Sequence, residues 1–353
     1  MSILFSVLPK GFPDPSMPVP ASVQVVEALH QPTMYRLHYT FNSADGDFPL
    51  LKHRHLEPES ELAVMAMPGT VPEYLVYGPV VRQDIEVVDG GAGSTLEVVG
   101  GDLCLAMDRE DKSKVWNNVT DSLAVTEIVG KGYSLIPKVD TTSTLHSEFT
   151  HQLVQRESDL RFVRRLARRN GFWFWITTKA PQVNIAHFKR FRPGGAPDVE
   201  FRLNAKEGVN VLKASISWDT ERPVSASLKQ LSLSDKSVIA ASVQRSPLTG
   251  LASKALGSVV SKPRSAHIAV PVDDSGSLKA RAEALLIDSG WFVSARVVTR
   301  VSKLKKVVHA HTVAKLDGVG SRHSGDYVVA RVVHDIGPDE HYMTIDLIRN
   351  GWN

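Results

Sequence analysis

Two histidine pairs are the first candidates for chemistry. His53 and His55 are separated by one residue, and so are His309 and His311. On a strand, residues two apart point to the same face, so either pair could supply two metal ligands. No cysteine and no closely spaced carboxylate completes either set. We therefore predict packed or surface histidines at these positions, and no metal site.

An acidic run beside prolines is the second candidate, and it consists of Glu57, Glu59 and Glu61. A glycosidase needs two opposed carboxylates in different environments, and nothing in this run distinguishes such a pair. The sequence also lacks the Gly-x-Ser-x-Gly motif of serine hydrolases. We therefore predict no catalytic residue and no cofactor, and we expect a protein that is not an enzyme.

Two polar segments predict surface structure. The segment "VDGGAGS" (88–94) lacks the Gly-Lys-Ser/Thr ending of a phosphate-binding loop, so Gly90, Gly91 and Gly93 predict a hairpin turn. The segment "DREDKSK" (108–114) mixes both charges and predicts a solvated loop.

The composition describes a folded protein with several domains. The chain has 353 residues, 42% of them hydrophobic, and its net charge is +3. This length predicts two to four domains, and the small charge does not by itself indicate a polyanionic partner. Cys104 is the only cysteine, so neither a disulfide nor a thiolate metal cluster is expected. No signal peptide and no membrane-spanning apolar run is evident, which favours a soluble protein without membrane insertion.

The elements that must carry these residues are mostly strands. Two β-rich blocks are predicted, one at 22–29, 34–41 and 73–100, and one at 296–303, 307–316, 326–336 and 341–351. Helical patterns are few, at 121–132, 159–170 and 277–290. Between the blocks, 225–265 is rich in Ser, Ala and Lys with weak periodicity, and we expect a long, partly mobile excursion that could order on a partner.

Helix ends are predicted from capping residues. For 121–132 the candidate caps are Asp121 and Ser122, and Leu123, Ala124 and Ile128 fall near one face. For 277–290, Ser277 is the candidate cap and Gly290 follows the last turn.

The segment "QRESDLRFVRRLARRNGFWFWI" (155–176) is the most distinctive. Ser158 is placed to cap a helix that ends at Asn170-Gly171, and "FWFWI" predicts a strand with both faces covered. The helix has one apolar stripe, formed by Leu160, Val163, Leu166 and Ala167, with Arg161, Arg164, Arg165 and Arg168 mainly off it. A packed helix explains this pattern better than nucleic-acid binding or a membrane-surface helix.

The two β-rich blocks contain one internal echo. Residues 79–102 and 330–351 each have a Val-Val strand, a polar-Asp-Ile exit, a turn and a return strand ending in Gly. Two related hairpins, one in each block, would produce this pattern.

The chain resembles a known family. The segment 155–176 is similar to the "RESD-x-F-x-x-R-L-x-x-x-G" segment of the VgrG and phage late-control protein D family, the tail hub (baseplate hub) proteins of contractile tails and injection systems. Residues 116–135, 209–232 and 323–351 resemble other family segments. The family's C-terminal OB-fold and β-helical spike are missing, which favours a hub whose spike is a separate polypeptide.

The resemblance implies a fold class that is mainly β with a few helices (α+β). Two tail-tube-like β-barrels and small inserted α/β regions are expected. The expected domains are a first barrel at 1–130, an inserted α/β region at 131–205, middle strands with the excursion at 206–290, and second-barrel hairpins at 291–353. The barrels could be discontinuous.

The resemblance also implies a function. A homotrimer would adapt the sixfold tail tube to the threefold spike, with the tube protein, the separate spike protein and other baseplate proteins as partners. Assembly in the bacterial cytoplasm and a place in the tail baseplate are expected. His334 and Arg349 could line the lumen, join a neighbouring subunit or lie on a solvated sheet face. No sequence-specific binding of nucleic acid is expected of the hub. The alternatives are a tail-associated cell-wall hydrolase and a nucleic-acid-binding protein.

Overall fold

The computed structural model describes residues 4–42, 48–69, 71–89, 93–147, 152–192, 194–231, 236–269 and 275–353. The strands are β1 Phe5–Pro9, β2 Ser22–Ala28, β3 Met34–Phe41, β4 Glu61–Ala66, β5 Glu73–Glu86, β6 Ser94–Gly101, β7 Asp111–Trp116, β8 Val119–Thr120, β9 Ile136–Val139, β10 Leu145–His146, β11 Leu153–Ser158, β12 Phe172–Ala180, β13 Val183–Arg190, β14 Val199–Arg202, β15 Val211–Trp218, β16 Pro223–Leu231, β17 Val238–Val243, β18 Arg264–Ala269, β19 Val293–Arg300, β20 Val313–Asp317, β21 Gly325–Ile336 and β22 His341–Arg349. The helices are η1 Pro49–Lys52, α1 Cys104–Met107, α2 Asp121–Glu127, η2 Ile128–Gly132, α3 Asp159–Asn170, α4 Leu256–Val259, α5 Ser275–Ser289 and α6 Val301–Leu304.

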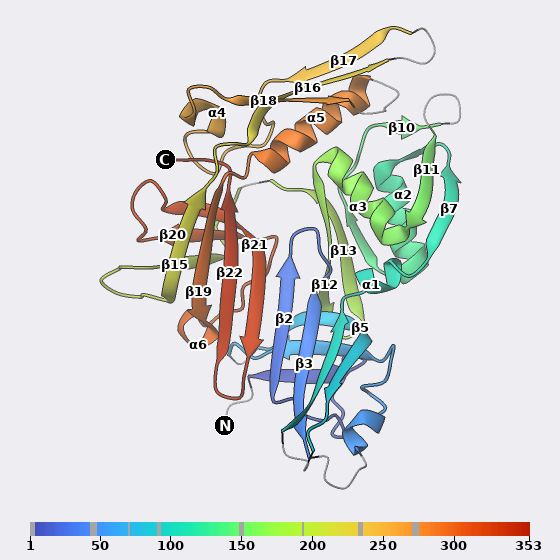
Figure 1. Cartoon of the computed structure of the whole chain (residues 1–353), viewed down its shortest axis with the longest axis vertical. Helices are drawn as coiled ribbons and strands as arrows, with labels where there is room; N and C mark the ends of the chain where they lie inside the picture. The colour runs from blue at the N-terminus through green and yellow to red at the C-terminus, as the bar shows by residue number, and fades with distance from the viewer. Residues whose placement is uncertain are drawn as a thin grey trace.

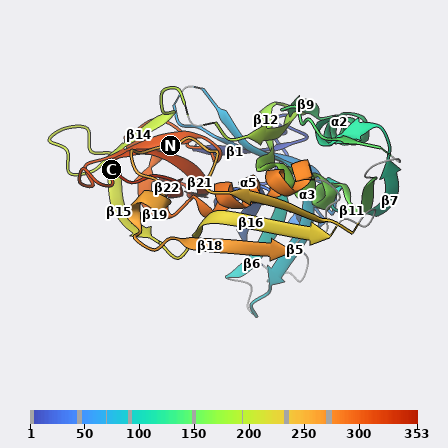
Figure 2. The ribbon, with the colours of Figure 1, turned by 90° about the horizontal axis from the view of Figure 1, so that it is seen from above.

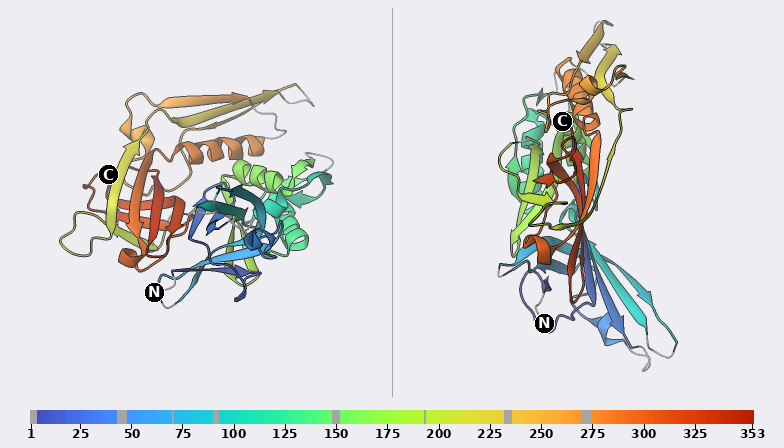
Figure 3. Two further views of the ribbon diagram at one scale, coloured as in Figure 1. Left: turned by 60° about the horizontal axis from the view of Figure 1, so that its bottom comes forward. Right: turned by 90° about the vertical axis from the view of Figure 1, so that its left-hand side faces the viewer.

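The molecule consists of a long sheet with two smaller units beside it. In Figure 1 the N-terminal strands lie at the bottom and the red strands β21 and β22 stand next to them. A green unit with α2 and α3 lies to one side, and the β16–β18 sheet with α5 lies at the top. The side view in Figure 3 places the N-terminal strands and the β16–β18 unit at opposite ends of the long axis. The expected fold class, mainly β with a few helices, is confirmed.

The long sheet has two halves, and each half wraps its own core. Its strand order is β1-β4-β5-β6-β3-β2-β21-β22-β19-β15, and β20 pairs with both β21 and β14. The N-terminal half buries Tyr35, Leu37, Leu62 and Val98, among others. The C-terminal half buries Phe201, Val297, Ile345 and Leu347, among others. Within the described ranges, β1 pairs only with β4 and β15 only with β19, so the halves are open barrels joined through β2 and β21.

The echoing segments both form antiparallel hairpins, β5–β6 and β21–β22, but β5 pairs with β6 only from Val80 onward, whereas β21 pairs with β22 from Val328 to Ile336. Each first strand changes partner midway. β5 pairs with β4 up to Pro79 and with β6 from Val80 onward. β21 pairs with β20 up to Val328 and with β2 from Arg331 onward. Gly78 marks the change in β5, because a Cβ there would lie 2.1 Å from the carbonyl oxygen of Gly101.

The α/β unit confirms the prediction for the arginine-rich segment. The Ser158 hydroxyl accepts the Arg161 amide, and Gly171 ends α3 in the left-handed conformation with φ 65°. The predicted stripe is buried against Phe174 and Phe188 of the β12–β13 hairpin. On the opposite face of β12, Trp173 and Trp175 meet His311 at ring-centroid distances of 6.0 Å and 4.3 Å. Both faces of "FWFWI" are therefore covered, as predicted.

The first helix departs from the prediction at its start. Thr120, and neither Asp121 nor Ser122, caps α2 by accepting the amide of Leu123. Leu123 is 56% exposed, whereas Ala124 and Val125 are buried. The predicted helix 121–132 is also two segments, since α2 continues into the π-helical turn η2.

The segment 225–265 is not the expected irregular excursion in its described part. It contributes β16, β17 and the start of β18, which form a three-stranded sheet in the order β17-β16-β18. This sheet buries Ala226 and Leu228 against Leu278 and Leu286 of α5. Helix α5 begins at Ser275, two residues before the predicted cap; the Ser277 side chain lies outside the described part of the chain.

Candidate functional site

The joint between the two halves of the long sheet is the first candidate for a functional feature. Strand β2 pairs antiparallel with β21 from Val23–Ile336 to Ala28–Arg331. Across this joint Gln24 Nε2 donates to Asp335 Oδ1 at 2.7 Å. The sheet therefore continues from one half into the other without a break in its backbone pairing.

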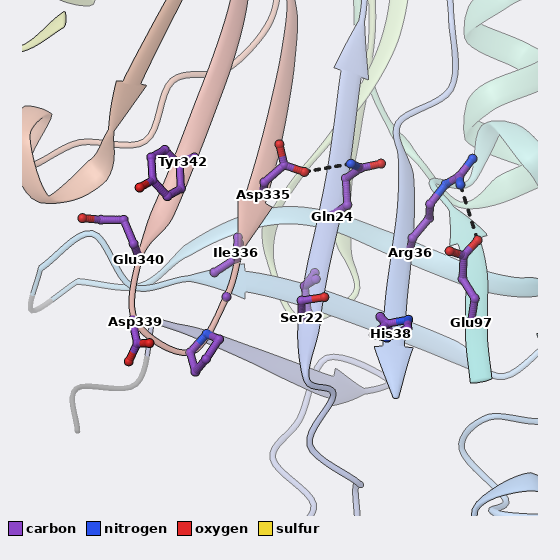
Figure 4. A pocket seen from close by; sticks show the side chains of 13 residues that line it. Ser22, Gln24, Arg36, His38, Glu97, Asp335, Ile336, Asp339, Glu340 and Tyr342 are labelled. Carbon is purple, nitrogen blue, oxygen red and sulfur yellow. Dashed lines mark hydrogen bonds and ion pairs between the residues drawn. The ribbon is translucent and has the colours of Figure 1, made fainter. Parts of the chain in front are cut away.

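One exposed face of the sheet runs across both halves. Eight strands contribute to it in the order β5-β6-β3-β2-β21-β22-β19-β15. Cross-strand register aligns one residue from each of seven neighbouring strands in a single row. In strand order from β5 to β19, the row contains Arg82, Val99, Arg36, Gln24, Asp335, Tyr342 and Arg300. Figure 4 shows the middle of this row, with Arg36, Gln24, Asp335 and Tyr342 on adjacent strands.

Ion pairs balance the charges of this sheet face. Arg36 pairs with Glu97 at 3.4 Å in the N-terminal half. In the C-terminal half, Asp346 lies 2.6 Å from Arg296 Nε and 3.6 Å from Arg331. Because both signs alternate over the strands, this surface is strongly hydrated and carries little net field.

A shallow hollow of about 650 Å³ lies on this face at the joint. Its floor includes Gln24 and Arg36, and the β21–β22 turn at 337–340 forms one rim (Figure 4). Three of its four carboxylates have partners, since Glu97 pairs with Arg36, Asp335 accepts from Gln24 and Glu340 accepts from Ser302 at 2.8 Å. The hollow thus suits contact with another surface better than bond-making chemistry.

A buried ionic network lies at the same joint. Glu27 of β2 lies 2.9 Å from His309 Nδ1, and its second oxygen accepts the Ala310 amide at 3.1 Å. His334 Nε2 of β21 lies 3.4 Å from Glu27 Oε1 as an ion-pair contact, and His334 Nδ1 lies 3.1 Å from His341 of β22. Glu27, His334 and His341 are all less than 10% exposed. The network therefore ties β2 of one half to β21 and β22 of the other.

The network shifts the pKa values of its members. Burial alone would raise the pKa of Glu27, but His309 and His334 hold it well below its usual range. Burial opposes protonation of His309, yet the charges of Glu27 and Glu73 outweigh it and raise the pKa of His309 to about 10. Burial lowers the pKa of His341 to about 3, and His334 adds to this shift. At neutral pH the network thus contains a Glu27 carboxylate, a His309 cation and a neutral His341.

These shifts predict a stability maximum near pH 6.5 to 7. The contribution of His309 is complete below its ordinary pKa of 6.5 and is lost as the pH rises toward 10. His341 imposes a cost as the pH falls from 6.5 toward 3, because only the unfolded chain takes up its proton there. Urea unfolding between pH 4 and 10 would measure the loss of stability on the acid limb and on the alkaline limb of this pH profile. His309→Gln should flatten the alkaline limb, and an alkaline limb unchanged in that variant would contradict the assignment.

The members of the two histidine pairs contact other side chains. His55 Nε2 contacts Asp14 at 2.8 Å, and His53 lies beside His55 with ring centroids 5.4 Å apart. His309 belongs to the buried network, whereas His311 stacks on Trp175 and burial lowers the pKa of His311 to about 3. Among the described residues, no group of three or more potential metal ligands occurs.

The three carboxylates of the acidic run do not converge on one site either. Glu59 forms an ion pair with Arg109, and Glu61 accepts the Tyr77 hydroxyl at 2.7 Å. Glu57 is exposed. These carboxylates have separate partners and form no opposed pair.

His334 and Arg349 are not on an exposed face, which corrects all three expectations for them. His334 is 0% exposed and Arg349 is 1% exposed. Arg349 stacks over the Tyr327 ring at 5.2 Å and approaches the carbonyl oxygens of Ser324 and Leu251 at 3.4 Å. Both side chains therefore lie inside the protein, His334 at the joint between the halves and Arg349 in the C-terminal half.

The "RESD" residues have structural roles at the start of α3. Glu157 accepts from Arg165 at 2.6 Å, and Ser158 caps the helix. Asp159 is buried and accepts from Lys112 at 2.5 Å and from the Tyr133 hydroxyl at 2.8 Å. The motif therefore fixes the helix in its unit, as the packed-helix interpretation predicts.

The predictions for the two polar segments, 108–114 and 88–94, have different outcomes. The segment 108–114 is not a solvated loop, because Asp111 begins β7, which pairs with β11 and contributes Lys112 to Asp159. Residues 90–92 of the glycine-rich segment lie outside the described residues. Its last glycine, Gly93, has φ 90°, which fits a turn.

Sequence reasoning missed the buried network, although a signal was present. In β2, Val23, Val25 and Glu27 share the buried phase of the strand. A carboxylate in that phase requires a cationic partner. The partner comes from more than 280 residues away, and no local pattern identifies it.

No helix in the described part of the chain has the length and apolar character needed to cross a membrane. No curated protein sequence matches the chain.

Solved structures with the same fold include tail proteins. The prophage MuSo2 43 kDa tail protein from Shewanella oneidensis aligns with TM-score 0.70 and 15% identity over 99% of both chains. A tail protein from Neisseria meningitidis MC58 aligns with TM-score 0.70 and 11% identity, over 98% of this chain and 96% of that one. The E. coli protein c3393, a component of a type VI secretion system, aligns with TM-score 0.61 and 14% identity, over 98% and 76%.

A sequence-family model described as the Alg8 N-terminal domain matches residues 19–338. This match spans most of the chain and includes both halves of the long sheet. The chain therefore belongs to the Alg8 N-terminal domain family, and it shares its fold with the solved tail proteins.

Proposed function

We propose that this chain is a structural, non-enzymatic baseplate hub of a contractile tail or injection system. Three copies would form a ring that adapts the sixfold tail tube to the threefold spike. The observation that carries this proposal is the pairing of β2 with β21, which joins two similar half-barrels into one continuous sheet. Three such chains present six half-barrels, so a threefold ring can match a sixfold tube.

The exposed sheet face is the part that would line the channel. Its eight strands cross both halves, and its charges are paired across neighbouring strands. A hydrated wall with little net field would let proteins pass without strong adhesion. The hollow at the joint would then open into the channel.

The ends of this face offer edges for contacts between copies. Within the described residues, β15 and the second half of β5 each pair on one side only. Exposed apolar side chains lie near both edges, Val81 and Ile85 on β5 and Leu212 and Trp218 on β15. Pairing the β15 edge of one copy with the β5 edge of the next is a heterologous contact, and such contacts close rings.

The domain division remains part of this proposal. The first tube-like barrel would come from residues 1–130 and the second from 291–353, with an α/β region and middle strands between them. The second barrel would be discontinuous, since Phe201 of β14 and Val211 of β15 join its core. Strand β7, within 1–130, contributes Trp116 to the α/β core.

A trimer is the expected state of the purified chain, alone or with its spike protein. Light scattering should give three times the chain mass of 38.7 kDa. Ile85→Asp should shift the protein toward monomers, because it places a charge at the apolar edge of β5. Val19→Asp, at a position that is 82% exposed and lies outside β5 and β15, is the matched control and should leave the trimer intact.

Monodisperse monomers of the natural sequence, both alone and with tube and spike proteins, would overturn the hub proposal. Cell-wall digestion by the purified protein would favour the hydrolase alternative instead. A mobility shift of DNA that falls steeply with salt would favour nucleic-acid binding.

A further inference from the structure

A cleft lined by arginines lies between α3 and α5. The two helices pack against each other, and Figures 1 and 2 show α5 between α3 and the β16–β18 sheet. The cleft has a volume of about 590 Å³. Its lining residues are Glu157, Arg161, Arg164, Arg165, Arg168, Arg169, Arg281, Ala284, Leu285 and Asp288. Six guanidinium groups therefore face two carboxylates.

Three of these arginines have carboxylate partners. Arg161 lies 3.3 Å from Asp108 and 2.5 Å from Asp111. Arg165 donates to Glu157 at 2.6 Å, and Arg169 forms an ion pair with Asp121. These pairs hold the three side chains in place at the borders of the cleft.

Arg164 and Arg168 are different. Within the described part of the chain, neither forms a hydrogen bond or an ion pair. The Nε and Nη2 atoms of Arg164 are buried there without an acceptor. A buried guanidinium without an acceptor is costly. The buried carboxylate of Asp102 interacts with Arg164 electrostatically but forms no ion pair with it. Arg164 lines the cleft, so a further carboxylate can approach it from there.

The spacing of the arginines along α3 limits the class of ligand that the cleft can bind. Arg161, Arg164 and Arg168 follow one face of α3 at intervals of three and four residues, so their attachment points span about 10 Å along the helix axis. In an extended peptide, alternate side chains are about 7 Å apart. Two acidic side chains of one peptide could therefore reach successive turns of α3, whereas a single phosphate could not.

We propose that this cleft binds an acidic segment of a partner protein through Arg164 and Arg168. Carboxylates suit this role because they accept paired hydrogen bonds from a guanidinium. The cleft volume falls in the range of pockets for small ligands, which fits a short peptide. Its lining contains no aromatic side chain, whereas sites for single-stranded nucleic acid use aromatic stacking. This inference does not rest on the hub proposal.

Fluorescence anisotropy with a labelled hexaglutamate peptide tests the proposal. The full chain at low ionic strength should bind the peptide saturably. Arg168→Gln should weaken binding roughly tenfold, and Arg164→Gln combined with Arg168→Gln should weaken it further. Arg36→Gln combined with Arg82→Gln removes the same charge from the sheet face and is the matched control. That control should bind as the natural sequence does.

Three results would overturn the proposal. The first is the absence of saturable hexaglutamate binding, and the second is an equal loss of affinity in the cleft and control variants. The third is binding of a thymidine hexanucleotide as tightly as the peptide, which would assign the cleft to nucleic acid. Arg168 is exposed, so Arg168→Gln carries the test even if the Arg164 substitution impairs folding.

Discussion

Replacing Leu166 by Asp should destabilise the chain by several kcal/mol, on the order of 4 kcal/mol. Leu166 is 0% exposed and lies in the α/β core with Val163 and Phe174. A carboxylate there would be buried in an apolar environment. The fold would have to accept an unpaired charge or a protonated acid, and both cost free energy.

Chemical denaturation with guanidinium chloride would measure this loss. Leu123→Asp in α2 is the matched control, since Leu123 is 56% exposed near a helix N-terminus, where a negative charge is tolerated. The control should change the free energy of unfolding by no more than about 0.5 kcal/mol. Equal stability of the two variants would show that α3 does not pack through the predicted stripe.

The α3 segment was predictable because its signals are local. The cap Ser158, the apolar stripe and the left-handed Gly171 all lie within a few turns of one another. Each agrees with the others, and none needs a distant residue. The strand after it was predictable for the same reason, as its alternation gives two buried faces.

The predictions that were wrong concern residues whose contact partners are distant in the sequence. The segment 225–265 has weak periodicity because its core positions include the small Ala226, and the covering residue Leu286 comes from α5. The charges of 108–114 suggested a loop, but Lys112 pairs with Asp159 across the β7–β11 pair. Arg349 suggested an exposed face, but the loop at Ser324 supplies carbonyl acceptors. Residue type alone does not reveal such long-range partners.

The same limit applies to the candidate site. The sequence indicated a hairpin in each β-rich block, and β5–β6 and β21–β22 are these hairpins; that the two are related stays a prediction. It did not indicate that β2 and β21 join them, since residues Gln24 and Asp335 are 311 positions apart. The hub proposal depends on this joint, and so does the buried network beneath it.

Replacing Glu27 by Gln should therefore destabilise the chain by about 3–5 kcal/mol, because it removes one partner of a buried ion pair. The side chain of Glu27 is only 10% exposed, and Gln keeps its shape while removing the charge that His309 needs. The variant should also lose stability less steeply between pH 6.5 and 10, since Glu27 would no longer raise the pKa of His309 and only Glu73 would remain beside it. Glu97→Gln, in an exposed pair with Arg36, is the control and should cost less than about 1 kcal/mol. Urea unfolding would measure both variants. A cost for Glu27→Gln no larger than that of the control would mean that the two halves hold together without the network.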